Sequence, residues 1–289
     1  MNRILKCLAK SPIGIERINE VLRDTASLYR VYYIPKKDNT GNRMISAPSD
    51  ELKDLQYLVL PKIKRLPIHK ASAAYEKGCS TKKNAKRHSK RDYILHIDIK
   101  SFFPSIDQNV FNTTLKRFYN SEELDTLWSL CSYKGGLPIG APTSPYLCNR
   151  IMRKIDKKLN RLSFSLRYTR YADDMIFSSK KYIDRTIINK VSDILAIYGF
   201  RINDSKTYFM SYRREVTGII LTDQDKLSTG TSYKKELKKD IYNLLVRNVG
   251  RKDVVIGKLA YLRNIEPQYA EVLKRKYINN DNINLFKGI

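Results

Sequence analysis

Cysteines are few in this chain, and none forms a sequence pair typical of a metal site. The 289 residues include Cys7, Cys79, Cys131 and Cys148, which are widely separated and contain no CxxC pair. We therefore expect neither a zinc site nor a disulfide framework, and we interpret the thiols as reduced, as in a cytoplasmic protein.

Long apolar runs are also missing. No segment approaches the roughly 18 apolar residues that a membrane-spanning helix needs. The first residues, MNRILKCLAK, contain no apolar stretch of signal-peptide length, and no internal repeat or low-complexity linker occurs. We expect no membrane association and, from the length, one or two domains.

Acidic residues are outnumbered by basic ones. The chain has 55 Lys and Arg against 29 Asp and Glu, which gives a formal net charge of +26 at pH 7. A hydrophobic content of 42% excludes a disordered polycation, because such tails lack apolar residues. The basic residues occur beside 20 Tyr and 9 Phe, a mixture that favours single-stranded or hybrid nucleic acid as partner. The alternative is a solvated surface whose charge serves solubility alone.

The apolar patterns predict both helices and strands. An amphipathic helix is expected within residues 13–30, and a β-hairpin follows, with its turn at residues 38–42. Further strands are expected at 93–99, 200–204 and 215–222, with two more within 166–179. From Tyr233 onward the pattern is helical and basic, so the change near residue 228 is the candidate domain boundary.

Three aspartates are the candidate catalytic side chains. Asp173 and Asp174 are adjacent at a tight turn, where Asn-Gly or Asp-Gly is the usual choice and where two carboxylates repel each other. Asp98 ends an otherwise apolar strand. Together they could gather oxygen ligands for Mg²⁺, and two such ions about 4 Å apart would clamp both oxygens of a phosphoryl transfer. The alternative for Asp173 and Asp174 alone is a solvent-exposed acidic turn. The alternative for Asp98 alone is an aspartate that caps the next element at the end of a strand.

Motifs around these aspartates resemble those of a known family. The YADD turn, the segment IDIKSFF around Asp98 and the loop GLPIGAPTSP are similar in order and spacing to motifs of reverse transcriptases, specifically the bacterial retron type. The resemblance covers roughly residues 29–265. It implies an α+β fold shaped as a right hand, with fingers, an antiparallel palm sheet backed by helices, and a thumb.

The resemblance also implies roles for individual residues. Asp98, Asp173 and Asp174 would bind two Mg²⁺ ions, for which Mn²⁺ could substitute, and the carbonyl of Ile99 would add a backbone ligand. Phe103, five residues after Asp98, would exclude a ribose 2′-OH; the alternative is an ordinary core Phe. The other nucleotide-binding residues implied are Lys36, Arg43, Ile139, Gly140 and Lys206.

Each of these remaining residues has its own part in that resemblance. Lys36 and Arg43 would hold the incoming triphosphate, although they could equally be solvated hairpin charges. Lys206 would lie near the leaving pyrophosphate and act as general acid. Ile139 stands where many reverse transcriptases have Gln, so a polar contact to the nucleotide is missing and its consequence for fidelity is left open.

Two further motifs point to the retron group and to RNA. The run NAKRH resembles the retron NAxxH signature and the run VTG resembles a second signature of the group. The RNA-binding residues implied by these motifs are Asn84, His88, Val216, Thr217 and Gly218, with a surface His in a basic loop as the alternative for His88. His69 and His96 carry no motif and are interpreted as structural.

A basic stripe on the last helical region is the other expected RNA contact. Lys234, Lys235, Lys238 and Lys239 are spaced to share one side of a helix, opposite an apolar stripe that includes Leu237. We expect this stripe to follow the phosphates of RNA. The alternative is a solvated helix face.

These expectations combine into one function. The chain would be the RNA-directed DNA polymerase of a retron, acting with dNTPs in the cytoplasm. It would copy part of a structured non-coding RNA into single-stranded DNA. An internal guanosine 2′-OH would serve as primer, so that RNA and DNA stay linked. No RNase H segment is apparent, so a host RNase H and a separate antiphage effector are the expected partners. The alternatives are another bacterial reverse transcriptase, either group II intron-like or defence-associated, and a non-catalytic RNA-binding scaffold.

The same resemblance suggests how the chain is divided. The expected parts are the N-terminal helix and fingers at 1–92, a first palm segment at 93–107, fingers and palm helices with the template loop at 108–150, the palm with the YADD hairpin at 151–227, and the thumb at 228–289.

Overall fold

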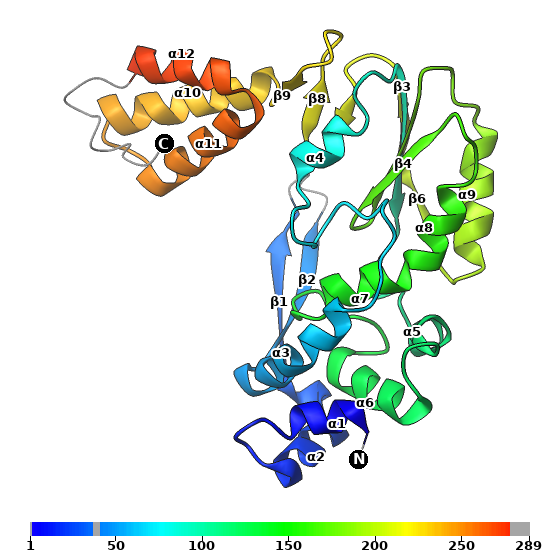
Figure 1. The fold of residues 1–289 in the computed structure, drawn as a ribbon. Helices are drawn as coiled ribbons and strands as arrows, with labels where there is room; N and C mark the ends of the chain where they lie inside the picture. The colour runs from blue at the N-terminus through cyan, green and yellow to red at the C-terminus, as the bar shows by residue number, and fades with distance from the viewer. Residues whose placement is uncertain (1, 37–40, 278–289) are drawn as a thin grey trace.

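The chain folds into an elongated α+β molecule. The structure, a computed structural model, describes residues 2–36 and 41–277. Figure 1 shows the N-terminal helices at one end, a β-sheet with its helices in the upper part, and a group of C-terminal helices beside them. No helix within the described ranges is long and apolar enough to cross a membrane.

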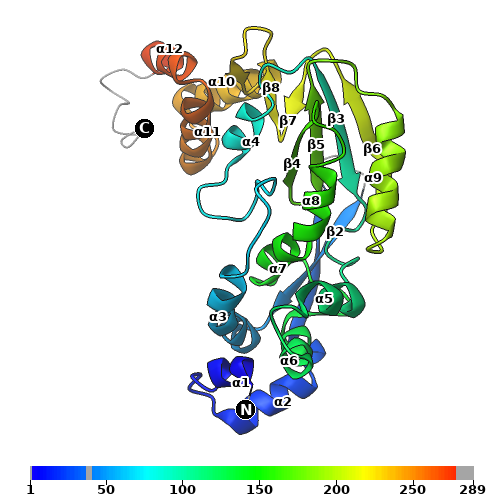
Figure 2. The same cartoon turned by 45° about the vertical axis from the view of Figure 1, so that its right-hand side comes forward.

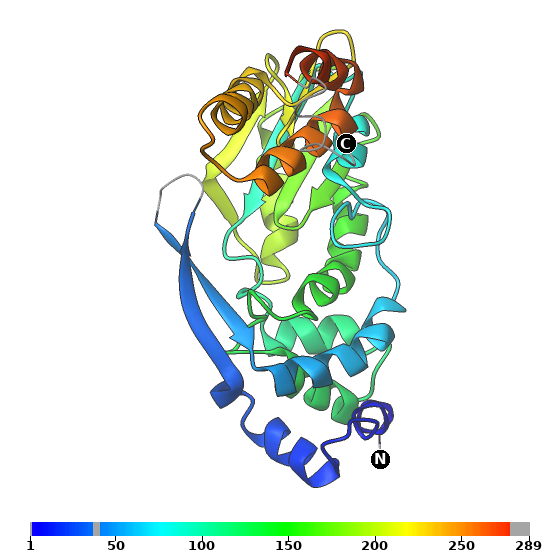
Figure 3. The same cartoon turned by 90° about the vertical axis from the view of Figure 1, so that its left-hand side faces the viewer.

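The N-terminal part combines short helices with a two-stranded ribbon. Its elements are α1 (Arg3–Leu8), α2 (Ile15–Arg23), a 3₁₀ turn (Ala26–Leu28), β1 (Tyr29–Pro35), β2 (Asn42–Pro48) and α3 (Asp50–Lys64). The helix expected within 13–30 is thus shorter than predicted. The antiparallel hairpin is confirmed, and it stands apart from the sheet at the left of Figure 3. Its predicted turn falls largely on residues 37–40, which lie outside the described residues.

A four-stranded antiparallel sheet forms the centre of the described fold. Its strands are β3 (Tyr93–Ile99), β4 (Arg167–Tyr171), β5 (Asp174–Ser179) and β6 (Ile202–Met210), in the order β4-β5-β3-β6. The strand expected at 200–204 is therefore longer than predicted and reaches residue 210. In this register Asp98 lies between Asp174 on β5 and Asn203 on β6.

The two faces of the sheet have different coverings. On one face Leu95, Ile97 and Ile99 belong to the main hydrophobic core. Besides α1, α2 and α3, the helices that contribute to this core are α5 (Gln108–Leu115), α6 (Ser121–Cys131), α7 (Ser144–Ile151), α8 (Arg153–Leu159) and α9 (Thr186–Ala196). Helices α8 and α9 lie along that face (Figure 2). The opposite face carries His96 and Asp98, because successive residues of a strand alternate between faces.

The C-terminal part has a hydrophobic core of its own. Its helices are α10 (Thr231–Val246), α11 (Lys252–Ile265) and α12 (Pro267–Tyr277). The buried residues that they share are Leu237, Ile241, Val255, Leu259, Leu262, Ala270 and Leu273.

A small apolar cluster joins this C-terminal part to the sheet. Ile265 at the end of α11 packs with Ile94 of β3 and with Ala85 of α4 (Thr81–Lys86). The segment expected as one strand at 215–222 is instead a hairpin, β7 (Glu215–Val216) and β8 (Ile219–Leu221), which pairs with β9 (Leu227–Ser228).

Candidate active site

One cavity brings most of the predicted site residues together. It has a volume of about 650 Å³ and lies where β3, the hairpin β1–β2 and the loop before α7 meet. The predicted residues that line it are Lys36, Arg43, Asp98, Ile99, Phe103, Ile139, Gly140, Asp173 and Lys206.

The turn that holds the paired aspartates is strained and held by neighbours. Ala172 has φ 59°, a left-handed conformation that is unusual for a residue with a side chain. Arg170 donates from Nη1 to the Ala172 carbonyl at 2.9 Å, and the Ile99 N–H donates to the Asp173 carbonyl at 3.1 Å. The turn is therefore attached both to its own strand and to the strand that carries Asp98.

A buried ion pair fixes Arg170 in turn. The Arg170 guanidinium makes two hydrogen bonds of 2.9 Å to Asp156 of α8, and both side chains are fully buried. The Tyr168 hydroxyl donates to the same carboxylate at 2.8 Å. Breaking a buried pair by removing one partner costs roughly 3–5 kcal/mol, so this pair is strongly held. No local motif in the sequence marks Arg170 or Asp156, so their pairing could be found only in the tertiary structure.

Burial and mutual repulsion raise the pKa of two carboxyls in the cavity. Burial, followed by the charges of Asp174 and Asp98, raises the pKa of Asp173 to about 6, against a smaller opposing effect of Arg43. Burial also raises the pKa of Asp98, although a hydrogen bond from Asn203 and the charge of Lys206 oppose it. A bound cation would relieve both effects, because it favours the charged carboxylates.

The donor set fits a hard divalent cation, although the carboxylates are partly engaged by neighbours. Carboxylate oxygens are the ligands that Mg²⁺ prefers. Within the part of the chain that the structure describes, no three His, Cys, Asp or Glu side chains already form a compact metal cluster. Asn203 Nδ2 donates to Asp98 Oδ1 at 2.9 Å, and His96 Nε2 lies 3.0 Å from Asp174 Oδ1.

His96 therefore belongs to the site, contrary to the interpretation of this residue as merely structural. Its ring stands on the same face of β3 as Asp98, two residues away, and contacts Asp174. Burial lowers the pKa of His96, but the hydrogen bond and charge of Asp174 outweigh burial, and the net shift is upward. The period of a strand could have indicated its position, whereas its partner could be found only in the tertiary structure.

The loop before α7 is fitted closely to the hairpin. The Ser46 N–H of β2 donates to the Ile139 carbonyl at 2.8 Å. Gly140 has φ +132°, and a Cβ there would come within 2.8 Å of the Ser46 carbonyl oxygen. Only glycine suits this position, since a side chain would both strain the backbone and push the loop off the hairpin.

Comparison with known proteins identifies the family. A family model described as reverse transcriptase (RNA-dependent DNA polymerase) matches residues 34–225, which is more than half of the chain. The retron Ec86 reverse transcriptase of Escherichia coli is 32% identical, over 97% of this chain and 92% of that protein. This chain belongs to the retron-type reverse transcriptases. It is accordingly an RNA-directed DNA polymerase of a retron.

A second curated relative agrees with this assignment. The retron Ec83 reverse transcriptase of Escherichia coli is 30% identical, over 87% of this chain and 88% of that protein. Among solved structures, apo telomerase from Candida tropicalis, truncated from the C-terminal domain, aligns with a TM-score of 0.49 and 14% identity, over 71% of this chain and 55% of that chain.

The defining residues of the NAxxH motif of this reverse transcriptase, Asn84, Ala85 and His88, are buried. His88 is fully buried, with Nδ1 2.7 Å from the Ser178 hydroxyl and Nε2 2.6 Å from the Thr169 hydroxyl. Asn84 is 1% exposed. Neither side chain presents its surface for contact with RNA in this structure, and the RNA-binding role of these two residues stays a prediction. His88 instead ties the segment after α4 to strands β4 and β5.

The VTG motif is divided between core and surface. Val216 is fully buried and packs with Ile94, so it contributes to the core of the described fold. Thr217 and Gly218 form the turn between β7 and β8, where Gly218 is exposed and Thr217 half-buried. Thr217 Oγ1 donates to the Thr81 carbonyl at 3.4 Å. The predicted RNA contacts of these two turn residues remain predictions.

The burial of His88 predicts a pH dependence of stability. Burial, followed by the charges of neighbouring arginines, lowers its pKa from 6.5 to about 3. Between these two pKa values His88 is protonated in the unfolded chain but not in the folded one. The stabilisation of the folded state is therefore fully present above pH 6.5 and is lost as the pH falls toward 3. Between pH 7.5 and 5.0 this effect amounts to about 2 kcal/mol. We expect the free energy of unfolding of wild type, measured with urea, to decrease by this amount between the two pH values, and that of His88→Gln not to show this decrease. An equal decrease in wild type and variant would contradict the assignment of the effect to His88.

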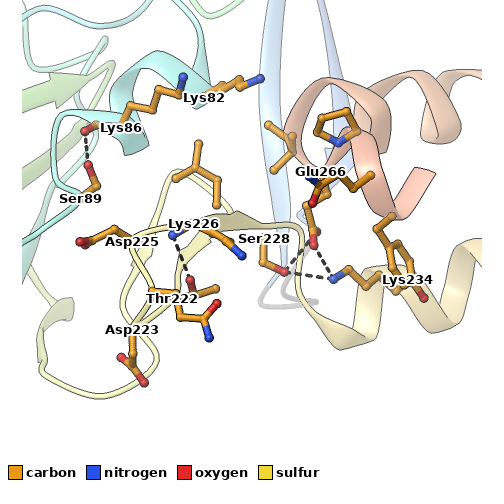
Figure 4. Close-up of a pocket in the computed structure, with 16 residues that line it drawn as sticks. Lys82, Lys86, Ser89, Thr222, Asp223, Asp225, Lys226, Ser228, Lys234 and Glu266 are labelled. Carbon is orange, nitrogen blue, oxygen red and sulfur yellow. Dashed lines mark hydrogen bonds and ion pairs between the residues drawn. The ribbon is translucent and has the colours of Figure 1, made fainter. Parts of the chain in front are cut away.

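The four lysines of α10 do not form one free stripe, which differs from the expected arrangement. Figure 4 shows Lys234 directed at Ser228 and Glu266, and its ammonium lies 2.6 Å from the Glu266 carboxylate. Lys234 and Lys238 also lie over the ring of Tyr269 of α12, at 4.5 and 5.8 Å. The other two members of the predicted stripe, Lys235 and Lys239, are exposed.

Glu266 anchors the C-terminal helices to the strand that precedes them. Besides Lys234, it accepts hydrogen bonds from the Thr229 N–H at 2.7 Å, the Thr229 hydroxyl at 2.9 Å and the Ser228 hydroxyl at 3.1 Å. These contacts form one wall of a second cavity of about 970 Å³ between α4, residues 222–228 and the start of α12. Lys234 is therefore part of the fold.

Proposed function

We propose that this enzyme copies part of a structured non-coding RNA into single-stranded DNA from the 2′-OH of an internal guanosine, so that RNA and DNA stay joined. The similarity to retron Ec86 reverse transcriptase over 97% of the chain is the observation that supports this proposal. The template RNA, the DNA product and dNTPs are its ligands. We place the reaction in the cytoplasm, in keeping with the scattered, unpaired cysteines.

For the chemical step we assign Asp98, Asp173 and Asp174, with the Ile99 carbonyl, as ligands of two Mg²⁺ ions. When bound, these ions would stabilise charge at the attacking 3′-oxygen and at the leaving pyrophosphate oxygen, and Mn²⁺ could replace them. The raised pKa values of Asp98 and Asp173 support this assignment. Carboxylates that lie close together to bind a cation repel each other when no cation is bound, and this repulsion adds to burial in raising their pKa values.

The other cavity residues bind and select the nucleotide in this proposal. Lys36 and Arg43, on the hairpin side, hold the triphosphate. Lys206 protonates the leaving pyrophosphate. Phe103 excludes the 2′-OH of a ribonucleotide, and the segment of Ile139 and Gly140 positions the base.

We further propose that the parts of the chain follow the right-hand plan. The N-terminal helix and fingers would occupy 1–92, the palm 93–107 and 151–227, fingers and palm helices with the template loop 108–150, and the thumb 228–289. The separate core of α10–α12 supports the thumb boundary. Residues 278–289 of that thumb lie outside the described residues. A host RNase H would remove the copied RNA, and a separate effector protein would act with the enzyme in antiphage defence.

The priming proposal can be tested with the RNA encoded beside the gene. Purified enzyme, that RNA, labelled dNTPs and Mg²⁺ should yield DNA that stays attached to RNA in a denaturing gel. Digestion with RNase should shorten this product without releasing a free DNA 5′ end. Placing 2′-deoxyguanosine at the mapped branch position should abolish it. Products that begin only from an added DNA primer would contradict the proposal and favour another bacterial reverse transcriptase.

The exposed lysines of α10 provide a test of RNA binding by the thumb. Changing Lys235 and Lys239 together to Gln should weaken RNA binding and reduce the slope of log K against log [salt] by about 0.7–0.9 for each lost phosphate contact. The matched pair Lys234 and Lys238, also changed to Gln, should lower stability while leaving that slope closer to wild type, because these side chains face Glu266 and Tyr269. Filter binding between 50 and 300 mM salt measures the affinity and the slope in each of the two variants. An unchanged slope in the first variant would show a merely solvated face.

A further inference from the structure

An aromatic side chain that no motif marks lies beside Phe103 in the active-site cavity. Tyr75, in the segment between α3 and α4, lines the same cavity as Phe103 and Asp98. Its ring lies next to the Phe103 ring, with centroids 6.4 Å apart and planes inclined by 60°. Tyr75 is nevertheless 39% exposed, so its ring borders the open space of the cavity instead of being enclosed in the core.

The backbone at Tyr75 is left-handed. Its φ is 65°, a conformation that few residues with a bulky side chain adopt, because the Cβ then crowds a neighbouring carbonyl. Such a conformation costs free energy and persists only where the surrounding structure holds the chain in place. Conformations of this kind cluster at binding and catalytic sites, so we looked for the contacts that hold Tyr75.

The residues that precede Tyr75 are attached to the strand of the YADD turn and to α7. The Ala73 N–H donates to the Arg170 carbonyl of β4 at 2.8 Å. The Ala74 carbonyl accepts a hydrogen bond of 2.9 Å from the buried Asn149 side chain of α7. Because the Arg170 side chain also donates to the YADD turn, that turn and the segment before Tyr75 share one support.

The residue that follows Tyr75 is held by α7 as well. The Glu76 carboxylate pairs with the Arg150 guanidinium, which is almost fully buried. Asn149 Nδ2 lies 3.3 Å from the same carboxylate. The chain is thus fixed immediately before and after Tyr75, and the ring cannot leave the cavity wall by a shift of the backbone without breaking these contacts.

We propose that Tyr75 is a positioning residue for nucleotide selection, whose ring supports the Phe103 ring where Phe103 meets the sugar of the incoming nucleotide. This inference rests on the proposed role of Phe103 in excluding a ribose 2′-OH. A side chain excludes one small group only while neighbours prevent it from moving aside. Phe102 lies on Phe103 with ring centroids 5.4 Å apart, and Tyr75 supplies a second ring. Tyr75 would act through Phe103, without touching the nucleotide itself.

Two substitutions remove the ring but suit the backbone. Asn and Gly adopt the left-handed conformation more readily than other residues, so Tyr75→Asn and Tyr75→Gly should keep the course of the chain. Tyr75→Phe removes only the hydroxyl. Tyr182→Asn is the matched control, because Tyr182 is exposed, packs on Tyr93 and lies outside the cavity lining.

The measurement is the ratio of kcat/KM for dNTP and rNTP in single-nucleotide incorporation on a defined primer–template. We expect both ringless variants to lower the preference for dNTP by about 2- to 12-fold, the factor that corresponds to one aromatic pair. Tyr75→Phe and Tyr182→Asn should keep the wild-type ratio. A role in stability alone would lower the incorporation of both nucleotides alike and leave the ratio unchanged. The wild-type ratio in both ringless variants would therefore overturn the inference.

A double variant tests whether Tyr75 acts through Phe103. Adding Tyr75→Asn to Phe103→Ala should cause no further decrease in the ratio, because the ring that Tyr75 supports is already gone. A further decrease as large as that caused by Tyr75→Asn alone would show that Tyr75 acts on the nucleotide directly, and would overturn the positioning role. Thermal unfolding shows whether each compared protein is folded.

Phe103→Ala alone separates this inference from the role of Phe103 beneath it. If Phe103→Ala keeps the wild-type ratio, the proposed role of Phe103 fails, and the role of Tyr75 fails with it. If Phe103→Ala lowers the ratio while the two ringless variants of Tyr75 do not, the role of Phe103 stands and only the positioning role of Tyr75 is wrong.

Discussion

Changing Asp173 and Asp174 together to Asn should abolish DNA synthesis, with a loss of roughly a thousand-fold or more. Metal ions contribute several kcal/mol of charge stabilisation in phosphoryl transfer, and each 1.4 kcal/mol is about a factor of ten in rate. The double variant removes the charge of two of the three carboxylates proposed as ligands. Primer extension with a DNA primer on an RNA template, at saturating Mg²⁺, measures the loss directly.

The same variant should fold at least as well as wild type without metal. Burial and neighbouring charges raise the pKa of Asp173 to about 6, so keeping this carboxyl charged at neutral pH costs more free energy in the folded protein than in the unfolded chain. A neutral Asn removes that penalty, and any gain in stability should disappear as the pH falls below about 4, where Asp173 is protonated in both states. RNA affinity should be retained, because it depends on basic surfaces elsewhere. Near wild-type synthesis would refute the catalytic assignment.

Changing Phe103 to Ala should admit ribonucleotides, lowering the preference for dNTP over rNTP by about 10- to 200-fold. Exclusion of one small group by a fitted apolar surface is worth roughly this much. Phe103 lines the cavity, and its ring packs on Phe102 and Tyr75 at centroid distances of 5.4 and 6.4 Å. Its main-chain carbonyl accepts hydrogen bonds from Leu137 at 3.2 Å and Ile106 at 3.1 Å. The backbone should therefore keep its place when the ring is removed.

The measurement is the ratio of kcat/KM for dNTP and rNTP in single-nucleotide incorporation. Phe103→Tyr keeps the ring and is the matched control, which should retain the preference for dNTP. A ratio in Phe103→Ala equal to that of wild type would show that Phe103 only packs against Phe102. That outcome would leave the metal ligands unaffected, since Phe103 is proposed to act on the sugar alone.

Local patterns in the sequence predicted the centre of this enzyme. The alternation of β3 set Asp98 on one face of a strand, and the adjacent Asp173 and Asp174 marked the turn, because strand period and turn chemistry are properties of a few consecutive residues. The resemblance to retron reverse transcriptases placed Lys36, Arg43 and Lys206 near them. In the structure Asp98, Asp173 and these three basic residues line one cavity, and Asp174 follows directly on Asp173. Their roles in binding metal and nucleotide stay predictions.

Burial and long-range partners could be decided only by the tertiary structure. His88 lies in a basic segment that looks exposed, yet the hydroxyls of Thr169 and Ser178 enclose it. Lys234 belongs to a run of lysines, yet Glu266 of a later helix pairs with it. His96 carries no motif, yet it contacts Asp174 across the sheet. Local periodicity states which residues share a face, whereas the pairing of strands and helices determines which faces are covered and which charges meet.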